Sequence, residues 1–159
     1  MTSARPAPAA LARLLALGVP VVLLGGAYLS QSAGGLHPCE MCYWQRWPHF
    51  FAIAVAALAF LFPAPSRNAR LLTALAAVAI AVSGAIGVFH AGVEYKWWEG
   101  LTRCASGGAM TLDELMNVPL VRCDQVQFSF LSVSMAGWNA ILSLGSAAVI
   151  AVLLWRKSA

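Results

Sequence analysis

Charged side chains are scarce in this chain. Of its 159 residues, 10% are Asp, Glu, Lys or Arg and 60% are hydrophobic. Soluble domains carry about 25% charged and about 45–50% apolar residues. Two long stretches, residues 71–90 and 135–155, contain no formal charge at all. This lack of charge excludes an ordinary soluble domain and indicates a membrane protein.

The chain also lacks a run of basic residues, although its formal net charge is +4. Its Lys and Arg residues flank the apolar stretches singly or in pairs. Such an arrangement cannot follow a phosphate backbone. Nucleic acid is therefore excluded as a partner, and the lipid bilayer is the expected environment. Internal repeats are absent too, so we expect a single domain over residues 1–159.

Four apolar stretches are long enough, or nearly so, to cross a bilayer, whose hydrocarbon core of about 30 Å needs about 20 helical residues. We therefore predict an all-α membrane protein, a bundle of four transmembrane helices connected on one side by loops 31–43 and 91–134. The helices are expected at about residues 11–30, 44–62, 71–90 and 135–155. In the second loop, Thr111 to Glu114 fits a capping box. This motif predicts a short amphipathic helix there.

Acidic residues are missing from one side of this arrangement. All six lie in the two loops 31–43 and 91–134, whereas basic residues flank the opposite helix ends (Arg5, Arg13, Arg67, Arg70, Arg156 and Lys157). By the positive-inside rule, both termini are expected in the cytoplasm and the two loops outside it. The first apolar stretch could instead be a cleaved signal peptide. Its removal, however, would leave an odd number of spans and undo the segregation of charge.

Cysteine is absent from every apolar stretch. The four cysteines, Cys39, Cys42, Cys104 and Cys123, all fall in the two outer loops. Those loops face an oxidising compartment, where disulfides persist. Four cysteines allow three pairings. Loop geometry favours Cys39 with Cys42 and Cys104 with Cys123, and the other two pairings would bridge the loops.

The Cys39-Glu40-Met41-Cys42 motif lies where a polar segment meets an apolar one. A thiolate in a C-x-x-C motif is stabilised at a helix N-terminus or beside a cation. Cys42 would have both if a helix begins near it, because Arg46 follows four residues later on the same face. A structural disulfide and half of a zinc site are the alternatives. Zinc is disfavoured because Cys104 and Cys123 form no second compact knuckle, so no metal is expected.

The second cysteine pair extends this chemistry. One dithiol at the membrane boundary and another in a loop can form a two-stage relay, since thiol–disulfide exchange carries oxidising equivalents through mixed disulfides. A structural disulfide that closes the long loop is the alternative for Cys104 and Cys123.

The chain resembles the bacterial DsbB family of quinone-dependent thiol oxidases. The likeness extends over nearly the whole chain and is carried by Pro38–Arg46, His90–Glu94, and Cys123-Asp124 leading to Ser134–Asn139. It implies a four-helix enzyme of the bacterial inner membrane that reoxidises a periplasmic, DsbA-like thioredoxin-fold oxidase. It also implies that the electrons pass to ubiquinone or menaquinone. The short segment between Cys104 and Cys123 departs from the family pattern.

The resemblance also implies a role for each site residue. Cys104 would be attacked by the reduced partner and form the mixed disulfide. Cys123 would then join Cys39 transiently and free Cys42 to donate electrons to the quinone. Arg46 would stabilise the Cys42 thiolate or the developing quinone oxyanion.

Some of these roles, and the enzyme class itself, have alternatives. Arg46 could extend to lipid phosphate groups instead, and His90 could bond a quinone carbonyl, relay a proton or lie at the membrane interface. A disulfide-stapled, non-catalytic scaffold would need neither Arg46 nor a separable Cys39–Cys42 dithiol. A thiol oxidoreductase of the vitamin K epoxide reductase type shares the chemistry, but Gln45-Arg46 fits that type less well.

Overall fold

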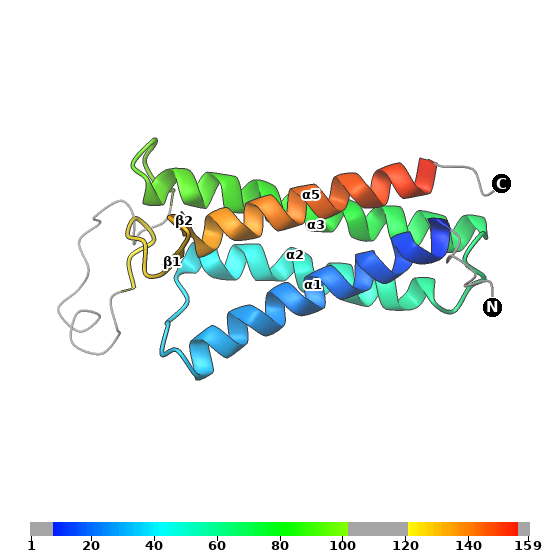
Figure 1. Cartoon of the computed structure of the whole chain (residues 1–159), viewed down its shortest axis with the longest axis horizontal. Coiled ribbons are helices and arrows are strands. Elements are labelled where there is room, and N and C mark those ends of the chain that lie inside the picture. Colours follow the sequence, from blue (N-terminus) through cyan, green and yellow to red (C-terminus); the bar gives the residue numbers. More distant parts are fainter. Residues whose placement is uncertain (1–7, 102–120, 156–159) are drawn as a thin grey trace.

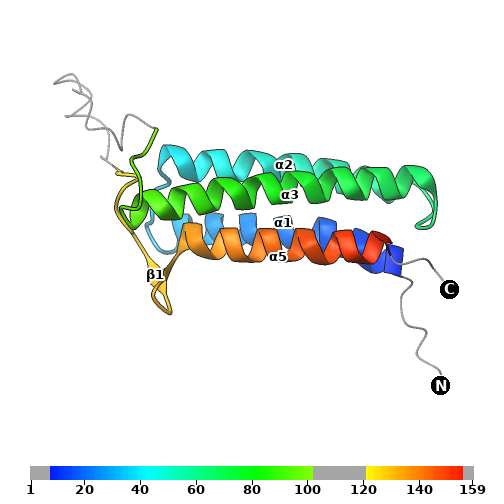
Figure 2. The same cartoon turned by 90° about the horizontal axis from the view of Figure 1, so that it is seen from above.

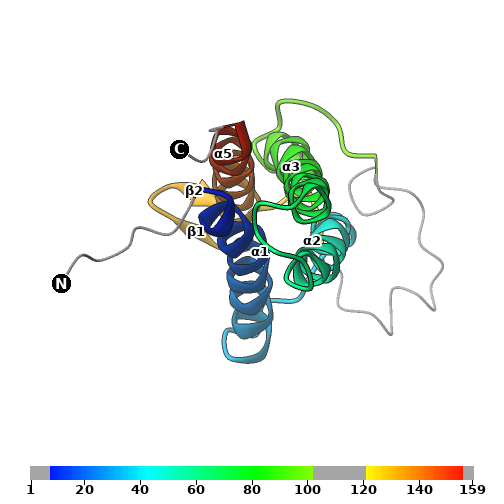
Figure 3. The same cartoon turned by 90° about the vertical axis from the view of Figure 1, so that its right-hand side faces the viewer.

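The computed structural model describes residues 8–101 and 121–155. Its main elements are four long helices that lie side by side in a bundle (Figure 1): α1 (Pro8–Ser32), α2 (Glu40–Ala59), α3 (Arg67–Glu94) and α5 (Met135–Trp155). Viewed end-on, the helices follow one another around the bundle in the order α1, α2, α3, α5 (Figure 3). The start of α1, the α2–α3 turn and the end of α5 lie at one end, which we call the inner end (Figure 2). The cysteine-bearing segments lie at the other, outer end.

Three of these helices, α1, α3 and α5, are long and apolar enough to cross a membrane. The chain is therefore a membrane protein, and the predicted all-helical class is confirmed. Helix α2 has 20 residues but carries Gln45, Arg46 and His49 in its first half. Length and composition alone therefore do not mark α2 as a span. The fourth crossing remains a prediction.

Helix α2 begins at Glu40, whereas the sequence predicted a start near residue 44. Cys39 is its N-cap, with extended backbone angles, and the Cys39 sulfur accepts a hydrogen bond from the backbone N–H of Cys42 at 3.2 Å. Cys42 therefore lies in the first helical turn, where the helix dipole favours negative charge. At its other end α2 stops at Ala59 rather than near residue 62. A side chain from α1 helps to close this end, because Arg13 donates to the Ala59 carbonyl at 3.2 Å.

Helix α3 is longer than predicted at both ends. Ser66 caps its start by accepting a hydrogen bond from the backbone N–H of Ala69 at 3.2 Å. The helix then continues past His90 to Glu94, because the intervening residues are small or apolar and none breaks the helix. Glu94 was expected in a loop but is the last helical residue of α3.

Helices α3 and α5 approach each other closely through small residues. A Cβ added to Gly87 would lie 3.0 Å from the Ala136 carbonyl oxygen and 3.0 Å from the Ala140 nitrogen. Such contacts replace the hydrophobic driving force that helices lack inside a lipid bilayer. They bring the outer halves of α3 and α5 together with the start of α2.

A short antiparallel hairpin that the sequence did not predict precedes α5. It pairs β1 (Ser129–Phe130) with β2 (Val133–Ser134). Its two turn residues, Leu131 and Ser132, both have positive φ, 51° and 63°, as a type I′ turn requires. Neither is the Gly or Asn that normally signals this turn, so the hairpin could not be predicted from these residues. The short helix predicted at Thr111 to Glu114 lies outside the described residues.

Candidate functional site

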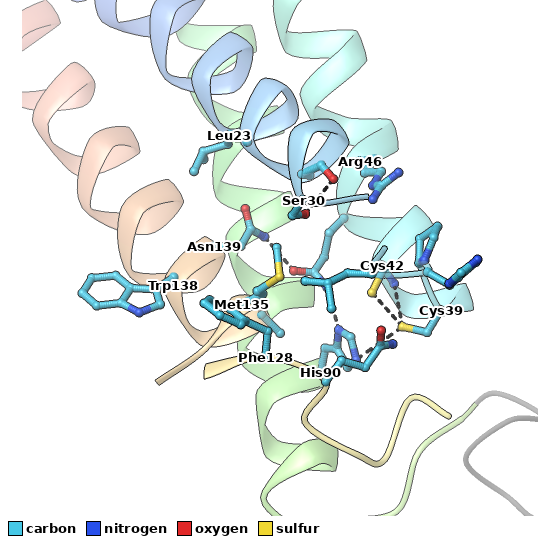
Figure 4. A pocket seen from close by; sticks show the side chains of 18 of the residues that line it. Leu23, Ser30, Cys39, Cys42, Arg46, His90, Phe128, Met135, Trp138 and Asn139 are labelled. Atoms are coloured by element: carbon cyan, nitrogen blue, oxygen red, sulfur yellow. Dashed lines mark hydrogen bonds between the residues drawn. The ribbon is translucent and has the colours of Figure 1, made fainter. Parts of the chain in front are cut away.

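A cavity of about 340 Å³ lies at the outer half of the bundle (Figure 4). This volume is in the range of small-molecule sites, which are mostly apolar with a few placed polar groups. Helix α1, which diverges from α2 towards this end (Figure 1), contributes mainly aliphatic wall. Helices α2, α3 and α5, with the α2 N-cap, contribute most of the sulfur and polar groups: Cys39, Cys42, Gln45, Arg46, His49, His90, Glu94 and Asn139.

Three cysteine side chains meet at one edge of this cavity. The sulfurs of Cys39 and Cys42 are 2.8 Å apart. Cys123 is fully buried and is hydrogen-bonded to Cys39, with which it packs in a small apolar cluster. These hydrogen bonds, first that with Cys123 and then that with Cys42, together with burial, raise the pKa of the Cys39 thiol. Cys39 thus lies between the other two cysteines. Cys104 lies outside the described residues.

The guanidinium of Arg46 is held inside the protein. The residue is only 8% exposed, and its Nη1 donates to the Gln31 side-chain oxygen at 3.1 Å. Its charge also lies over two aromatic rings, 4.8 Å from the centre of Tyr28 and 5.4 Å from that of Tyr43. Arginine keeps its charge in such surroundings. The structure therefore places a fixed cation in the wall of the cavity that Cys42 also lines.

His90 is buried and lies close to Cys39 and Cys42 (Figure 4). The Gln45 side-chain nitrogen donates to the Met41 carbonyl at 3.2 Å and lies 2.7 Å from His90 Nδ1. Because that nitrogen is the donor, Nδ1 is the acceptor and the ring proton is on Nε2. Nε2 lies 3.6 Å from the Cys39 sulfur. The ring also bonds the backbone of Cys123. This geometry places His90 against both Cys39 and Cys123.

Glu94 is a member of this site that the sequence reasoning missed. One of its carboxylate oxygens lies 3.8 Å from His90 Nε2, and its side chain bonds Ser134. Its other oxygen, Oε2, is buried without a hydrogen-bond partner among the described residues. The signal was present, because residues four apart share a helix face and Glu94 follows His90 by four. Because the helix was predicted to end at about residue 90, Glu94 was assigned to a loop and this pairing was not recognised.

A cluster of charges holds the segment that carries Cys123. Asp124 accepts from Lys96 at 2.6 Å and from Arg122 at 2.8 Å. Lys96 also donates to the Asp124 carbonyl oxygen at 2.7 Å. The hydrogen bonds from Arg122 and then from Lys96 hold the pKa of the Asp124 carboxyl well below its usual range. Cys123 is thereby fixed against Cys39 by its neighbour in the sequence.

We expect Asp124→Asn to slow formation of a Cys39–Cys123 disulfide by about three- to fivefold, because each lost ion pair contributes only modestly near the surface. The measurement is oxidant-driven crosslinking in a Cys42→Ser, Cys104→Ser background. A depressed pKa means that the ion pairs are complete above the ordinary value of about 4 and are lost only as the pH falls through the lower, folded value. The ratio of the crosslinking rate of the parent to that of Asp124→Asn should therefore be constant between about pH 6 and pH 8.

Glu99→Gln is the matched control for this experiment, because it removes an exposed carboxylate of the segment that follows α3. It should crosslink at the parent rate. An equal rate for Asp124→Asn would show that the charge cluster does not position Cys123.

Cys39, Cys42 and His90 carry donor groups that are typical of zinc sites. Ligand atoms of Cys39, Cys42 and His90 all lie within 4.8 Å of one another. Two sulfurs bound to a tetrahedral zinc at about 2.3 Å would be about 3.8 Å apart. The observed separation of 2.8 Å is closer to the disulfide bond length of about 2.05 Å. This spacing favours a redox dithiol over a shared ion.

Comparison with known proteins agrees with this chemistry. The family model described as Disulfide bond formation protein DsbB matches residues 9–153. A disulfide bond formation protein B of Aromatoleum aromaticum is 30% identical over 160 residues, covering 89% of this chain and 91% of that protein. The protein of the same description from Polaromonas naphthalenivorans is 30% identical over 168 residues, covering 95% and 96%. No solved structure matches significantly.

Proposed function

The chain belongs to the DsbB family of disulfide bond formation proteins, and we propose that it reoxidises a DsbA-like periplasmic thiol oxidase and passes the electrons to membrane quinone. As a family member it is a membrane oxidoreductase of disulfide bond formation. The identity of its partner and of its electron acceptor is the proposed part.

One observation carries the proposal: Cys39 contacts both Cys123 and Cys42, and Cys42 lines a largely apolar cavity. Thiol–disulfide exchange proceeds by attack of a thiolate on a disulfide sulfur. The sulfurs of Cys123, Cys39 and Cys42 are already in contact, so a disulfide can pass from one to the next. This series of sulfurs begins in the outer loop with Cys123 and ends with Cys42 at a cavity next to the bilayer.

In the proposed sequence, the reduced partner attacks Cys104 and Cys123 leaves as a thiolate. Cys123 attacks Cys39, which frees Cys42, and the partner's second thiol resolves the mixed disulfide at Cys104. The partner has then lost two electrons and two protons. Cys104 then attacks Cys123 and restores the Cys104–Cys123 disulfide, and Cys39 leaves as a thiolate. The His90 Nε2–H, 3.6 Å from the Cys39 sulfur, can donate a hydrogen bond to that thiolate, and Glu94 beside it can supply or accept the proton.

The residues present fit a quinone. The cavity wall is mostly apolar, and two of its lining groups, His49 Nδ1 and Glu94 Oε2, are buried polar atoms with no partner among the described residues. When bound, ubiquinone or menaquinone would supply the acceptor for two electrons. Cys42 would donate them, and Arg46 would hold negative charge in a low-dielectric site, where a fixed cation is most effective.

The proposed location is the bacterial inner membrane, with α2 as a fourth crossing, both termini in the cytoplasm and the redox cysteines in the periplasm. In a cysteine-free background, Pro65→Cys in the α2–α3 turn should be protected from a membrane-impermeant maleimide in intact cells. Ser129→Cys in β1 is the matched outer position and should be labelled. Labelling of Pro65→Cys with protection of Ser129→Cys would mean that the orientation is inverted.

The function is tested with purified chain in nanodiscs under anaerobic conditions. A reduced thioredoxin-fold dithiol protein and ubiquinone are added, and loss of partner thiols and of quinone absorbance are followed together. We expect two thiols lost for each quinone reduced, at rates that depend on the chain. Partner oxidation without quinone loss would identify a different electron acceptor.

A further inference from the structure

His49 is a buried residue of the cavity that takes no part in the proposed thiol–disulfide exchange. It lies on α2, is 2% exposed and lines the cavity. Its Nδ1 is buried and bonds none of the residues that the structure describes. Its other nitrogen, Nε2, lies 3.0 Å from the Asn139 side-chain oxygen.

Neighbouring groups determine which nitrogen of His49 carries the proton. The Asn139 side-chain nitrogen donates to the Ser83 carbonyl at 3.2 Å and to the Gln45 side-chain oxygen at 2.8 Å. A carbonyl can only accept, so the Asn139 oxygen must be the atom that faces His49, where Ser143 also donates to it at 3.1 Å. An amide oxygen cannot donate, so Nε2 carries the proton. In the neutral ring, Nδ1 is then an acceptor that has no donor among the residues the structure describes.

His49 also lies at a useful distance from the dithiol. Cys42, Arg46 and His49 occupy positions i, i+4 and i+7 of α2, which share one helix face. At 1.5 Å per residue, Cys42 and His49 are about 10 Å apart along the axis. The two ends of this row therefore differ in chemistry: a thiol and a cation at the outer end, and a bare hydrogen-bond acceptor at the inner end.

We propose that His49 Nδ1 accepts a hydrogen bond from the inner hydroxyl of the quinol, and so binds the reduced form of the ligand selectively. This inference rests on the proposed function. The quinone carbonyl has no proton to donate to Nδ1, whereas the quinol hydroxyl has one. In the overall step, Cys39 and Cys42 form one S–S bond and lose two electrons and two protons, and the quinone gains both to become the quinol. His49 thus stabilises the quinol, which is the product of that step. Asn139 positions the His49 ring through its contact with Nε2.

The test is binding rather than turnover. In a Cys42→Ser background, which cannot exchange electrons with the ligand, dissociation constants of a short-chain ubiquinone and of its quinol are measured separately by equilibrium dialysis. We expect His49→Leu to weaken quinol binding by about fivefold, the effect of one lost hydrogen bond, and to change quinone binding by less than about twofold. His49→Gln retains an acceptor oxygen and should recover part of the quinol affinity.

Thr73→Val is the matched control, because Thr73 is equally buried at 2% exposed. Its hydroxyl donates to the Ala69 carbonyl and does not line the cavity. It should leave both constants unchanged. Equal weakening of both ligands in His49→Leu, or no weakening of either, would overturn the inference and leave His49 a packing residue. If the parent protein bound neither form, the proposed quinone function itself would fail, which is a separate result.

Discussion

Replacing Cys42 with serine should reduce quinone reduction to the uncatalysed background while leaving the outer cysteine pair able to react with the partner. The physical reason is the position of the sulfur: Cys42 is in the first turn of α2, lines the cavity, and shares that cavity with the Arg46 cation. A serine hydroxyl keeps the shape of the side chain but cannot form the disulfide. The measurement is quinone absorbance during anaerobic turnover with the reduced partner.

The Cys104→Ser variant of this chain complements Cys42→Ser. It should abolish the mixed disulfide with the partner, yet the Cys39–Cys42 dithiol should still be oxidised by quinone when reduced chemically. Oxidation of the partner at the normal rate by Cys104→Ser would refute the relay, and so would sustained quinone reduction by Cys42→Ser.

The second large effect is expected at Arg46. Charge inside an apolar helix costs about 2.5–3.5 kcal/mol at mid-membrane, and less near the interface, so a retained arginine needs a compensating role. Arg46→Met should raise the apparent quinone KM and slow turnover by about tenfold or more, a loss of about 1.4 kcal/mol of transition-state stabilisation. Arg46→Lys should recover only part, because an ammonium does not reproduce the planar guanidinium. Turnover at varied quinone concentration measures both effects.

Arg13→Met is the matched control for this substitution. Arg13 is also a helical arginine, but it bonds the carbonyls of Ala59 and Phe62 at the inner end of the bundle, away from the cavity. Its loss should not change the quinone KM. Mixed-disulfide formation through Cys104 should be unaffected in both variants. An unchanged quinone KM in Arg46→Met would favour a structural role for its contacts with Gln31 and the two tyrosine rings.

The sequence predicted the family, which the comparison confirms, because the C-x-x-C motif and its flanking residues are local signals. It did not predict where α2 begins, since cysteine is not among the residues that usually cap helices and Cys39 does so through its sulfur. The predicted end of α3, at about residue 90, was also wrong. No Gly-Pro pair or polar segment directly follows His90 to stop the helix, so it continues to Glu94.

The hydrogen-bond network around the site could not have been predicted. Gln45 and Asn139 are 94 residues apart, and their contact depends on the close approach of α3 to α5 at Gly87. The proton positions on His49 and His90 follow only from that network. The position of Cys123 against Cys39 likewise depends on the charge cluster at Asp124, which no local pattern reveals.

We propose that the Cys39–Cys42 dithiol delivers its electrons directly to quinone. A Cys104→Ser, Cys123→Ser variant retains only that dithiol, so one measurement tests the claim: anaerobic addition of one equivalent of ubiquinone to the reduced variant, followed by thiol counting and disulfide mapping. We expect that one quinone is consumed per chain, that both thiols disappear and that a Cys39–Cys42 disulfide forms. Unreacted quinone with both thiols intact would contradict it.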